Sequence, residues 1–141
     1  MYGIHTRSID DKARVVIPPA LKNELGNEFY ITLGFDGNAE IRSSEAFESY
    51  RNTLESKSHF NRDVRTVTRI ILGNAAQVSL DKQNRISLPK NLIEKLNIQK
   101  DIVFVGTGTV IELWAKEKFD EFEASVSTED LAKLAQEISG I

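Results

Sequence analysis

The chain has 141 residues, of which 40% are hydrophobic and 28% charged, the composition of a single soluble globular domain. It contains no apolar stretch long enough to cross a bilayer and no basic-then-apolar leader, so we expect a cytoplasmic protein with no membrane partner. The absence of cysteine excludes disulfides, thiolate metal sites and cysteine nucleophiles, and with only two histidines, far apart in sequence, a transition-metal site has few candidate ligands. We therefore expect no metal site and no other cofactor.

A charged motif occurs twice in the chain. Residues 10–18 (DDKARVVIP) return 71 positions later as residues 81–89 (DKQNRISLP), with the aspartate, arginine, proline and apolar positions in register. Further matches are Leu21 and Leu25 with Leu92 and Leu96, Glu40 and Ile41 with Glu112 and Leu113 after a one-residue slip, and Phe47 with Phe119. Such self-similarity indicates one structural unit used twice.

The repeat predicts four segments. Residues 5–48 form the first copy, 49–75 a helical connector, 76–120 the second copy and 121–141 a helical tail. Because each copy alone has too little interior for its surface, we expect the two to share one core.

Each copy predicts the same elements in the same order. Strand-like runs on both sides of the motif, 2–8 with 14–17 and 76–80 with 86–88, predict one β-hairpin per copy. A short helix after proline, two strands around a glycine turn and an amphipathic helix follow. Their predicted positions are 19–25, 29–33, 39–42 and a helix from Ser44 in the first copy, and 90–96, 102–105, 110–114 and a helix from Lys116 in the second. We expect Phe47 and Phe119 to be core anchors of the last helices.

The connector and the tail each predict one more helix. Arg62, Arg65 and Arg69 share one face of the connector helix. They either grip phosphates or form a solvated or subunit-facing surface that pairs with acidic helices. In the tail, a helix start at 127–130 precedes an apolar stripe that we expect to dock within the chain or on a neighbour. The stripe consists of Leu131, Leu134, Ala135 and Ile138.

The charge is unevenly distributed although the net charge is only −3. Residues 57–95 carry eight basic against three acidic side chains, and residues 1–22 four against two. Residues 23–56 and 112–141 each sum to −5. The positive charge therefore surrounds both copies of the motif, which favours a polyanionic partner on that side of the protein. The alternative is a solvated surface on which basic residues cluster by chance.

The aspartate and arginine of the motif have two compatible interpretations. Asp10 and Asp81 are expected to be structural, capping each turn and pairing with the arginine four residues later. The basic side chains are then held outward for phosphates or guanine edges. The candidate DNA-binding residues are Arg7, Lys12, Arg14, Lys82 and Arg85.

The doubled Asp-x-x-x-Arg motif, followed by aliphatics and proline and ending in Glu-x-Trp with a Phe-bearing helix, resembles the MraZ family, whose halves are similar to the SpoVT-AbrB domain. The resemblance implies an α+β, mainly β fold, an interleaved double-split β-barrel formed by two tandem halves with flanking helices. It also implies a nucleoid-associated transcriptional regulator that assembles into homo-oligomeric rings. Such a regulator binds repeated elements in the promoter of a cell-division and cell-wall gene cluster that includes its own gene.

Two departures from the family pattern concern the turns. Ala13 and Asn84 stand where the family usually has glycine, and since alanine does not tolerate a left-handed conformation, we expect the first turn to differ in detail. Gln83 stands where the first copy has Lys12, so we expect the two halves to grip DNA unequally.

The alternative function is a ring-forming scaffold in which the Asp-Arg pairs only staple the hairpins. An enzyme is not expected, because the sequence contains no recognisable nucleophile-base arrangement, metal-spaced cluster or phosphate-cradling glycine loop. We therefore expect no catalytic residue.

Overall fold

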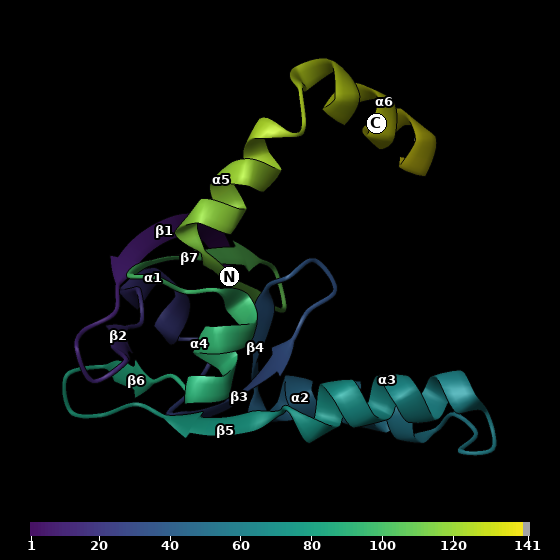
Figure 1. The fold of residues 1–141 in the computed structure, drawn as a ribbon, viewed down its shortest axis with the longest axis horizontal. Coiled ribbons are helices and arrows are strands. Elements are labelled where there is room, and N and C mark those ends of the chain that lie inside the picture. The colour runs from purple at the N-terminus through teal and green to yellow at the C-terminus, as the bar shows by residue number, and fades with distance from the viewer. Residues whose placement is uncertain (140–141) are drawn as a thin grey trace.

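The computed structural model describes residues 1–139, in which two similar series of elements follow one another (Figure 1). The first series is β1 (Tyr2–Ser8), β2 (Arg14–Val16), α1 (Pro19–Lys22), β3 (Glu28–Leu33), β4 (Ala39–Ser43), α2 (Ser44–Glu55) and α3 (Arg62–Gly73). The second is β5 (Ala76–Ser79), β6 (Arg85–Ser87), α4 (Lys90–Leu96), β7 (Asp101–Thr107), β8 (Ile111–Ala115), α5 (Lys116–Ala124) and α6 (Thr128–Ser139). The predicted tandem architecture of strands and flanking helices is confirmed.

The predicted hairpins are wrong, because neither strand before a motif pairs with the strand after it. β1 pairs with β7, β5 pairs with β3, and β2 pairs with β6, so each of these pairs joins the two copies. After β1, the chain turns through a left-handed residue, Ala13, with φ 58°, and β2 then joins β6 in a separate sheet instead of β1.

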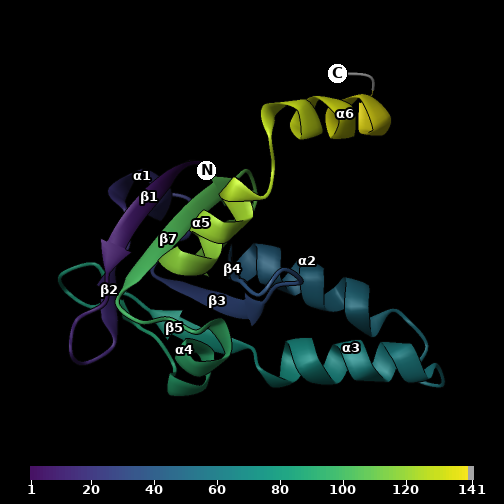
Figure 2. The same ribbon diagram turned by 45° about the horizontal axis from the view of Figure 1, so that its top comes forward.

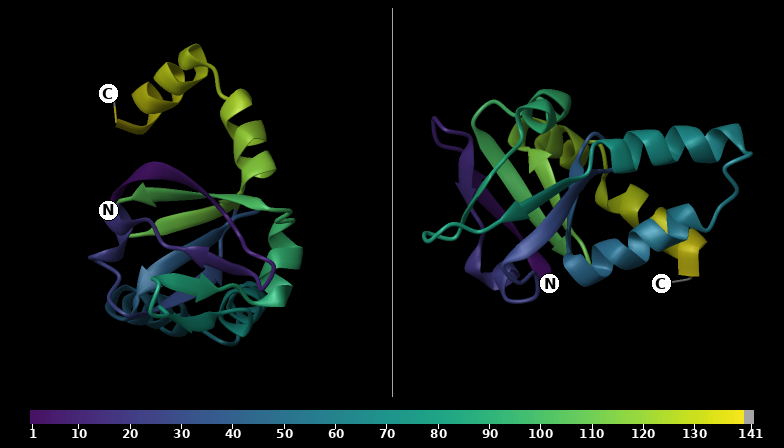
Figure 3. Two further views of the ribbon diagram at one scale, coloured as in Figure 1. Left: turned by 90° about the vertical axis from the view of Figure 1, so that its left-hand side faces the viewer. Right: turned by 90° about the horizontal axis from the view of Figure 1, so that it is seen from below.

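The larger sheet has six antiparallel strands in the order β1-β7-β8-β4-β3-β5, and β2 and β6 form a separate two-stranded ribbon. Within residues 1–139 the sheet ends at β1 and β5, so a closed barrel is not confirmed. When each strand is replaced by its partner in the other copy (β1 by β5, β3 by β7, β4 by β8 and the reverse), the same order is obtained, read from the other edge. The two copies are therefore related by a pseudo-twofold axis. Figures 2 and 3 show the sheet wrapped around the core, with the ribbon at one end.

The strand register has the same internal symmetry. In the central pair β4 and β8, Ala39 lies opposite Leu113 and Ile41 lies opposite Ile111, with Glu40 and Glu112 facing each other between them. Each of these glutamates accepts a hydrogen bond on its own strand: Glu40 Oε1 from Arg42 Nη2 at 2.9 Å, and Glu112 Oε1 from Trp114 Nε1 at 3.0 Å. The two like charges on the pseudo-twofold axis are thus each directed toward a donor.

One hydrophobic core serves both copies, as predicted from their size. Its fully buried side chains include Val15, Ile17, Leu21, Phe29, Ile31 and Ile41 from the first copy and Ile86, Ile102, Phe104, Ile111 and Leu113 from the second. The pairing of β1 with β7 brings the backbone of residues 1–2 very close to Gly106. A Cβ on Gly106 of β7 would lie 2.9 Å from the backbone of Met1 and Tyr2, so only glycine allows β1 to pair there.

The long helices are attached by aromatic side chains. Phe47 of α2 stacks on Tyr30 with ring centroids 4.0 Å apart, and Phe119 of α5 packs edge-on against Trp114 at 5.6 Å. Both phenylalanines are buried, which confirms their prediction as core anchors. The helices α2 and α5 continue past residues 48 and 120, the predicted ends of the two copies.

The last helices of the two series differ in their packing. α3 folds back against α2 and β3, whereas α6 projects from the end of α5 and stands clear of the sheet (Figures 1 and 2). The predicted start of α6 is confirmed: Ser127 Oγ accepts from Asp130 N at 3.0 Å, and Asp130 Oδ2 accepts from Ser127 N at 3.1 Å. In the described part of the chain, no helix is long and apolar enough to cross a membrane.

We predict that residues 1–75 do not fold alone. Truncation there removes β5, β6 and β7, leaving β1, β2 and β3 without partners across the repeat and the buried face of Val15 open to water. Circular dichroism and thermal melting of this fragment should show an unfolded or aggregated chain. Mixing it with residues 76–141 is the control, because complementation should restore a cooperative transition. A 1–75 fragment that melts cooperatively alone would contradict the shared core.

Candidate nucleic-acid interface

The ribbon of β2 and β6 fixes the directions of the two motif arginines. Its register pairs Arg14 with Ser87, Val15 with Ile86 and Val16 with Arg85. Because side chains alternate along a strand, Val15 and Ile86 point into the core, at 1% and 0% exposure, while Arg14 and Arg85 point outward. The ribbon is extended at both ends by the bonds from Ile17 N to Asn84 O at 3.0 Å and from Leu88 N to Ala13 O at 2.9 Å.

An aspartate in each loop holds the turn and its arginine. Asp10 Oδ1 accepts hydrogen bonds from the backbone N–H of Lys12 and of Arg14, each at 2.9 Å, and Oδ2 accepts from Arg14 Nε at 2.8 Å. We call this set of three bonds the aspartate clamp. The backbone N–H of Arg14 is the main cause that lowers the pKa of Asp10 below its ordinary value, with the guanidinium and the Lys12 N–H acting in the same direction.

The second loop repeats the clamp. Asp81 Oδ1 accepts from Gln83 N at 2.8 Å and Arg85 N at 2.9 Å, and Oδ2 accepts from Arg85 Nε at 2.8 Å. The same backbone N–H, here of Arg85, is the main cause that lowers the pKa of Asp81. Both aspartates are therefore held as carboxylates and as hydrogen-bond acceptors of their own loop.

The expected difference between the two turns is not found. Ala13 has φ 58° and Asn84 has φ 60°, so both residues before the arginines are left-handed. This conformation costs an alanine about 1–2 kcal/mol. Ala13 is held there by bonds on both sides, since its N–H donates to Asp10 O at 3.0 Å and its carbonyl accepts from Leu88 N. Tertiary pairing thus imposes on alanine the backbone that asparagine tolerates better.

Within residues 1–139, Arg14 and Arg85 differ in which of their guanidinium nitrogens form hydrogen bonds. Arg14 uses its Nε on Asp10, and within residues 1–139 neither of its Nη groups has a hydrogen-bond partner. Arg85 also donates from Nη2 to Gln83 Oε1 at 2.7 Å, and its Nη1 lies 3.9 Å from Asp10 Oδ2 of the other loop. Lys12 and Lys82 are exposed, with no ion pair in the described chain. Free cationic donors are therefore more numerous on the first loop.

Sequence reasoning missed Gln83 as a partner of Arg85 and Asp10 as a bridge between the loops. The signal for Gln83 was its place opposite Lys12 in the repeat, where an amide replaces a cation. No sequence signal indicated the contact of Arg85 with Asp10, because it depends on the pairing of β2 with β6.

Arg7 lies apart from the clamps. It is half-buried on β1, its Nη1 donates to Thr6 O at 2.8 Å, and it forms no ion pair in the part of the chain that the structure describes. The matching position in the second copy is the buried Val78. The structure therefore brings together Lys12, Arg14, Lys82 and Arg85 around one ribbon, but does not join Arg7 to them by any hydrogen bond.

The arginines of α3 lie far from the ribbon. The two motif loops protrude at one end of the molecule, while α3 extends from the other end (Figures 1 and 2). Arg62 and Arg69 are exposed, and Arg65 Nη1 donates to the carbonyls of His59 and Phe60 at 2.9 and 3.2 Å. Arg65 therefore holds the turn before its helix, and the three arginines do not extend the surface of the motif loops.

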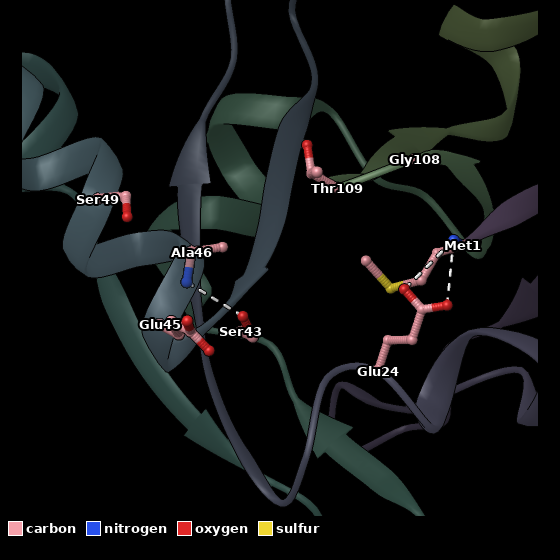
Figure 4. A pocket seen from close by; sticks show the side chains of 8 residues that line it. All are labelled: Met1, Glu24, Ser43, Glu45, Ala46, Ser49, Gly108 and Thr109. Carbon is pink, nitrogen blue, oxygen red and sulfur yellow. Dashed lines mark hydrogen bonds and ion pairs between the residues drawn. The ribbon is translucent and has the colours of Figure 1, made fainter.

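An open pocket between the N-terminus and α2 contains no reactive cluster (Figure 4). The Met1 amino group pairs with the Glu24 carboxylate at 3.4 Å, and Ser43 Oγ accepts from Ala46 N at 3.1 Å as the cap of α2. These polar groups are thus engaged in structural bonds. Across residues 1–139, no three His, Asp or Glu side chains gather in a way that could hold a metal ion.

Comparison with known proteins gives a consistent result. The family model described as "MraZ protein, putative antitoxin-like" matches twice, over residues 2–70 and 71–139. A protein named transcriptional regulator MraZ from Mycoplasma mobile is 40% identical over 139 residues, covering 98% of this chain and 95% of its own. Proteins of the same name from Mycoplasmopsis pulmonis (39% identical, covering 96% and 92%) and Thermoanaerobacter pseudethanolicus (35%, covering 99% and 99%) also match.

We predict that Ala13→Gly stabilises the protein by about 1 kcal/mol, because glycine adopts the left-handed conformation without the Cβ penalty. Urea unfolding measures the effect. The matched control is Ala20→Gly in α1, an exposed helical alanine, which should instead destabilise by about 0.5–1 kcal/mol. If Ala13→Gly destabilises as much as Ala20→Gly does, the left-handed turn is not present in solution.

Proposed function

The chain belongs to the MraZ family, and from that premise we propose that it is a sequence-specific DNA-binding transcriptional regulator that contacts DNA with the β2–β6 ribbon and its two loops. The observation that carries the proposal is the pair of clamped arginines on the outer face of the ribbon, with the free Nη groups of Arg14 and the exposed Lys12 and Lys82 beside them. A two-stranded ribbon fits the DNA major groove, and an arginine with two free Nη groups suits a guanine edge or a phosphate.

The clamp supplies the rigidity that base recognition needs. Each guanidinium is held through Nε by an aspartate that is itself fixed by two backbone N–H groups, so little side-chain freedom remains to be lost on binding. The aspartates also offset much of the local positive charge. We therefore propose that Arg14 reads a base, whereas Lys12 and Lys82 contact phosphates. Arg7 would approach the backbone from the side of β1.

The finer proposal follows the family resemblance. The protein would bind repeated elements in the promoter of a cell-division and cell-wall gene cluster that includes its own gene, acting in the cytoplasm at the nucleoid. A homo-oligomeric ring would present successive ribbons related by rotation about one axis, so that neighbouring copies meet DNA in the same orientation. Direct repeats match this arrangement, whereas a twofold dimer requires a palindrome.

A second candidate function is a ring-forming scaffold in which the Asp-Arg pairs are structural. The observation that favours it is the engagement of Arg85, which donates to Asp81 and Gln83 and approaches Asp10 of the other loop. In a scaffold Arg14 would likewise serve only to hold its own loop through Asp10. Its free Nη groups favour the DNA-binding function instead.

We predict that Arg14→Ala weakens binding to DNA carrying its own promoter by about 10- to 100-fold, the loss expected when one base-reading arginine is removed. Fluorescence anisotropy measures the binding and thermal melting the folding, which should change little. Asp11→Ala in the same loop is the matched control, because Asp11 lies outside the clamp, and it should not weaken binding. Asp10→Ala should destabilise the fold. If Arg14→Ala unfolds the protein while Asp10→Ala leaves it stable, the two roles are reversed.

We also predict that affinity depends on the helical phase of the DNA repeats. Two repeats engaged through one oligomer raise the effective concentration of the second contact, which strengthens binding by up to ~10²–10⁴-fold. Inserting roughly 5 base pairs, half a helical turn, between two direct repeats should abolish most of this gain, and inserting a full turn should retain it. Equal binding to both spacings, or tightest binding to an isolated inverted repeat, would rule out the ring on direct repeats.

A further inference from the structure

Two apolar surfaces of the chain have no partner within residues 1–139. One is the stripe along α6, where Leu131, Leu134 and Ile138 are exposed to 60%, 49% and 82%. The other is a groove between α3 and the β3–β4 turn, formed by Phe35 (75% exposed), Val67 (37%) and Ile70 (50%) and floored by Gly34, Thr66 and Ile71. Side chains of this size are costly to leave in water when they lie side by side.

The charges beside the two surfaces are opposite. α3 carries Arg62, Arg65 and Arg69 against one aspartate. On a helical wheel Arg62 and Arg69 border the side of Ile70. α6 carries Glu129, Asp130 and Glu137 against one lysine, and Asp130 and Glu137 border the side of Leu134. The apolar stripe with an acidic border therefore matches the apolar groove with a basic border.

The geometry prevents the two surfaces of one molecule from meeting. α5 is fixed to the sheet through Trp114, Phe119 and Phe122, so α6 begins on one side of the sheet, whereas α3 extends from the other side (Figures 1 and 2). Only residues 125–127 separate α5 from α6.

We propose that α6 of one copy docks in the α3 groove of a second copy, with Leu131, Leu134 and Ile138 on Phe35, Val67 and Ile70. The interface is heterologous, because it joins two different surfaces, and each docked copy leaves one groove and one helix free for the next. Such head-to-tail contacts generate a closed ring or an open filament. The ribbon loops stay uncovered, since they lie at the opposite end from α3 (Figure 1).

This interface deepens the proposed function, because it supplies the oligomer on which binding to repeated elements rests. In this interface the arginines of α3 and the C-terminal helix α6 both contribute to the contact between neighbouring copies. The arginines of α3 then face the acids of the neighbouring α6 rather than phosphates.

Disulfide trapping tests the interface directly, since the natural chain contains no cysteine. Full-length chains carrying Val67→Cys or Ile70→Cys are mixed with chains carrying Leu131→Cys or Leu134→Cys and mildly oxidised. We expect covalent dimers of one α3 variant with one α6 variant, at a yield at least fivefold above a mixture of Asn52→Cys with Leu134→Cys. Asn52 is exposed on α2 and lies outside the groove.

Three results would overturn the interface. They are equal yields from the groove and control mixtures, dimers formed mainly by the α6 variants alone, or an intramolecular disulfide in the Ile70→Cys/Leu134→Cys double variant at high dilution. As a second measurement, light scattering should show that Leu134→Asp lowers the oligomer to the monomer, and unchanged assembly would also contradict the proposal.

DNA binding separates this proposal from the proposed function. The Leu134→Asp monomer should keep its weak, Arg14-dependent binding to a single repeat and lose the gain from a second repeat. If trapping fails while binding to repeats persists, only the interface is wrong. If trapping succeeds and no DNA is bound, only the DNA-binding function is wrong.

Discussion

The pairing of β2 with β6 is the interaction on which the rest of the molecule depends. Three residues from each copy meet, and the pair Val15 and Ile86 is buried at the centre. This contact brings the two motif loops to one end of the molecule and turns both arginines to the same outer face. It also holds Ala13 in a conformation that alanine would otherwise avoid, because the Ala13 carbonyl accepts the hydrogen bond from Leu88. Without that pairing each loop would be an isolated turn with no partner strand.

The sequence contained the repeat, the order of the elements and the residues that anchor the helices, because these depend on local patterns. Phe47 and Phe119 were found by matching the two copies, and both are buried. The pairing of strands was not predictable in the same way. A strand, a polar turn and a strand look like a hairpin whichever partner each strand takes, and only long-range contacts decide between them. The left-handed turn at Ala13 was missed for the same reason, since the conformational preference of alanine is overruled by the hydrogen bond from Leu88, 75 positions away.

The two copies have the same order of elements and the same aspartate clamp, but they differ in several functional side chains. Arg7 corresponds to Val78, Lys12 to Gln83 and Arg42 to Trp114. The last of these substitutions keeps its structural purpose, since Arg42 and Trp114 both donate to a glutamate two residues earlier and both pack against an aromatic ring of the following helix. Of the other two, only the exchange of Lys12 for Gln83 lies in a motif loop, whereas Arg7 and Val78 lie on the sheet strands β1 and β5. Both exchanges leave the second copy with fewer cationic donors. The difference between Arg42 and Trp114 is thus compensated within each copy, whereas the loss of the cation at Gln83 is not.

The internal twofold symmetry makes the molecule equivalent to two paired units within one chain. Two separate chains paired in this way would form a dimer whose stability depends on concentration and whose halves must be identical. Because α3 joins the two halves in one chain, their pairing does not depend on protein concentration, and the two halves are able to differ in sequence. On the proposed function, a fused pair with unequal loops has a polarity: it distinguishes the two directions along a DNA strand, which a symmetric dimer is unable to do.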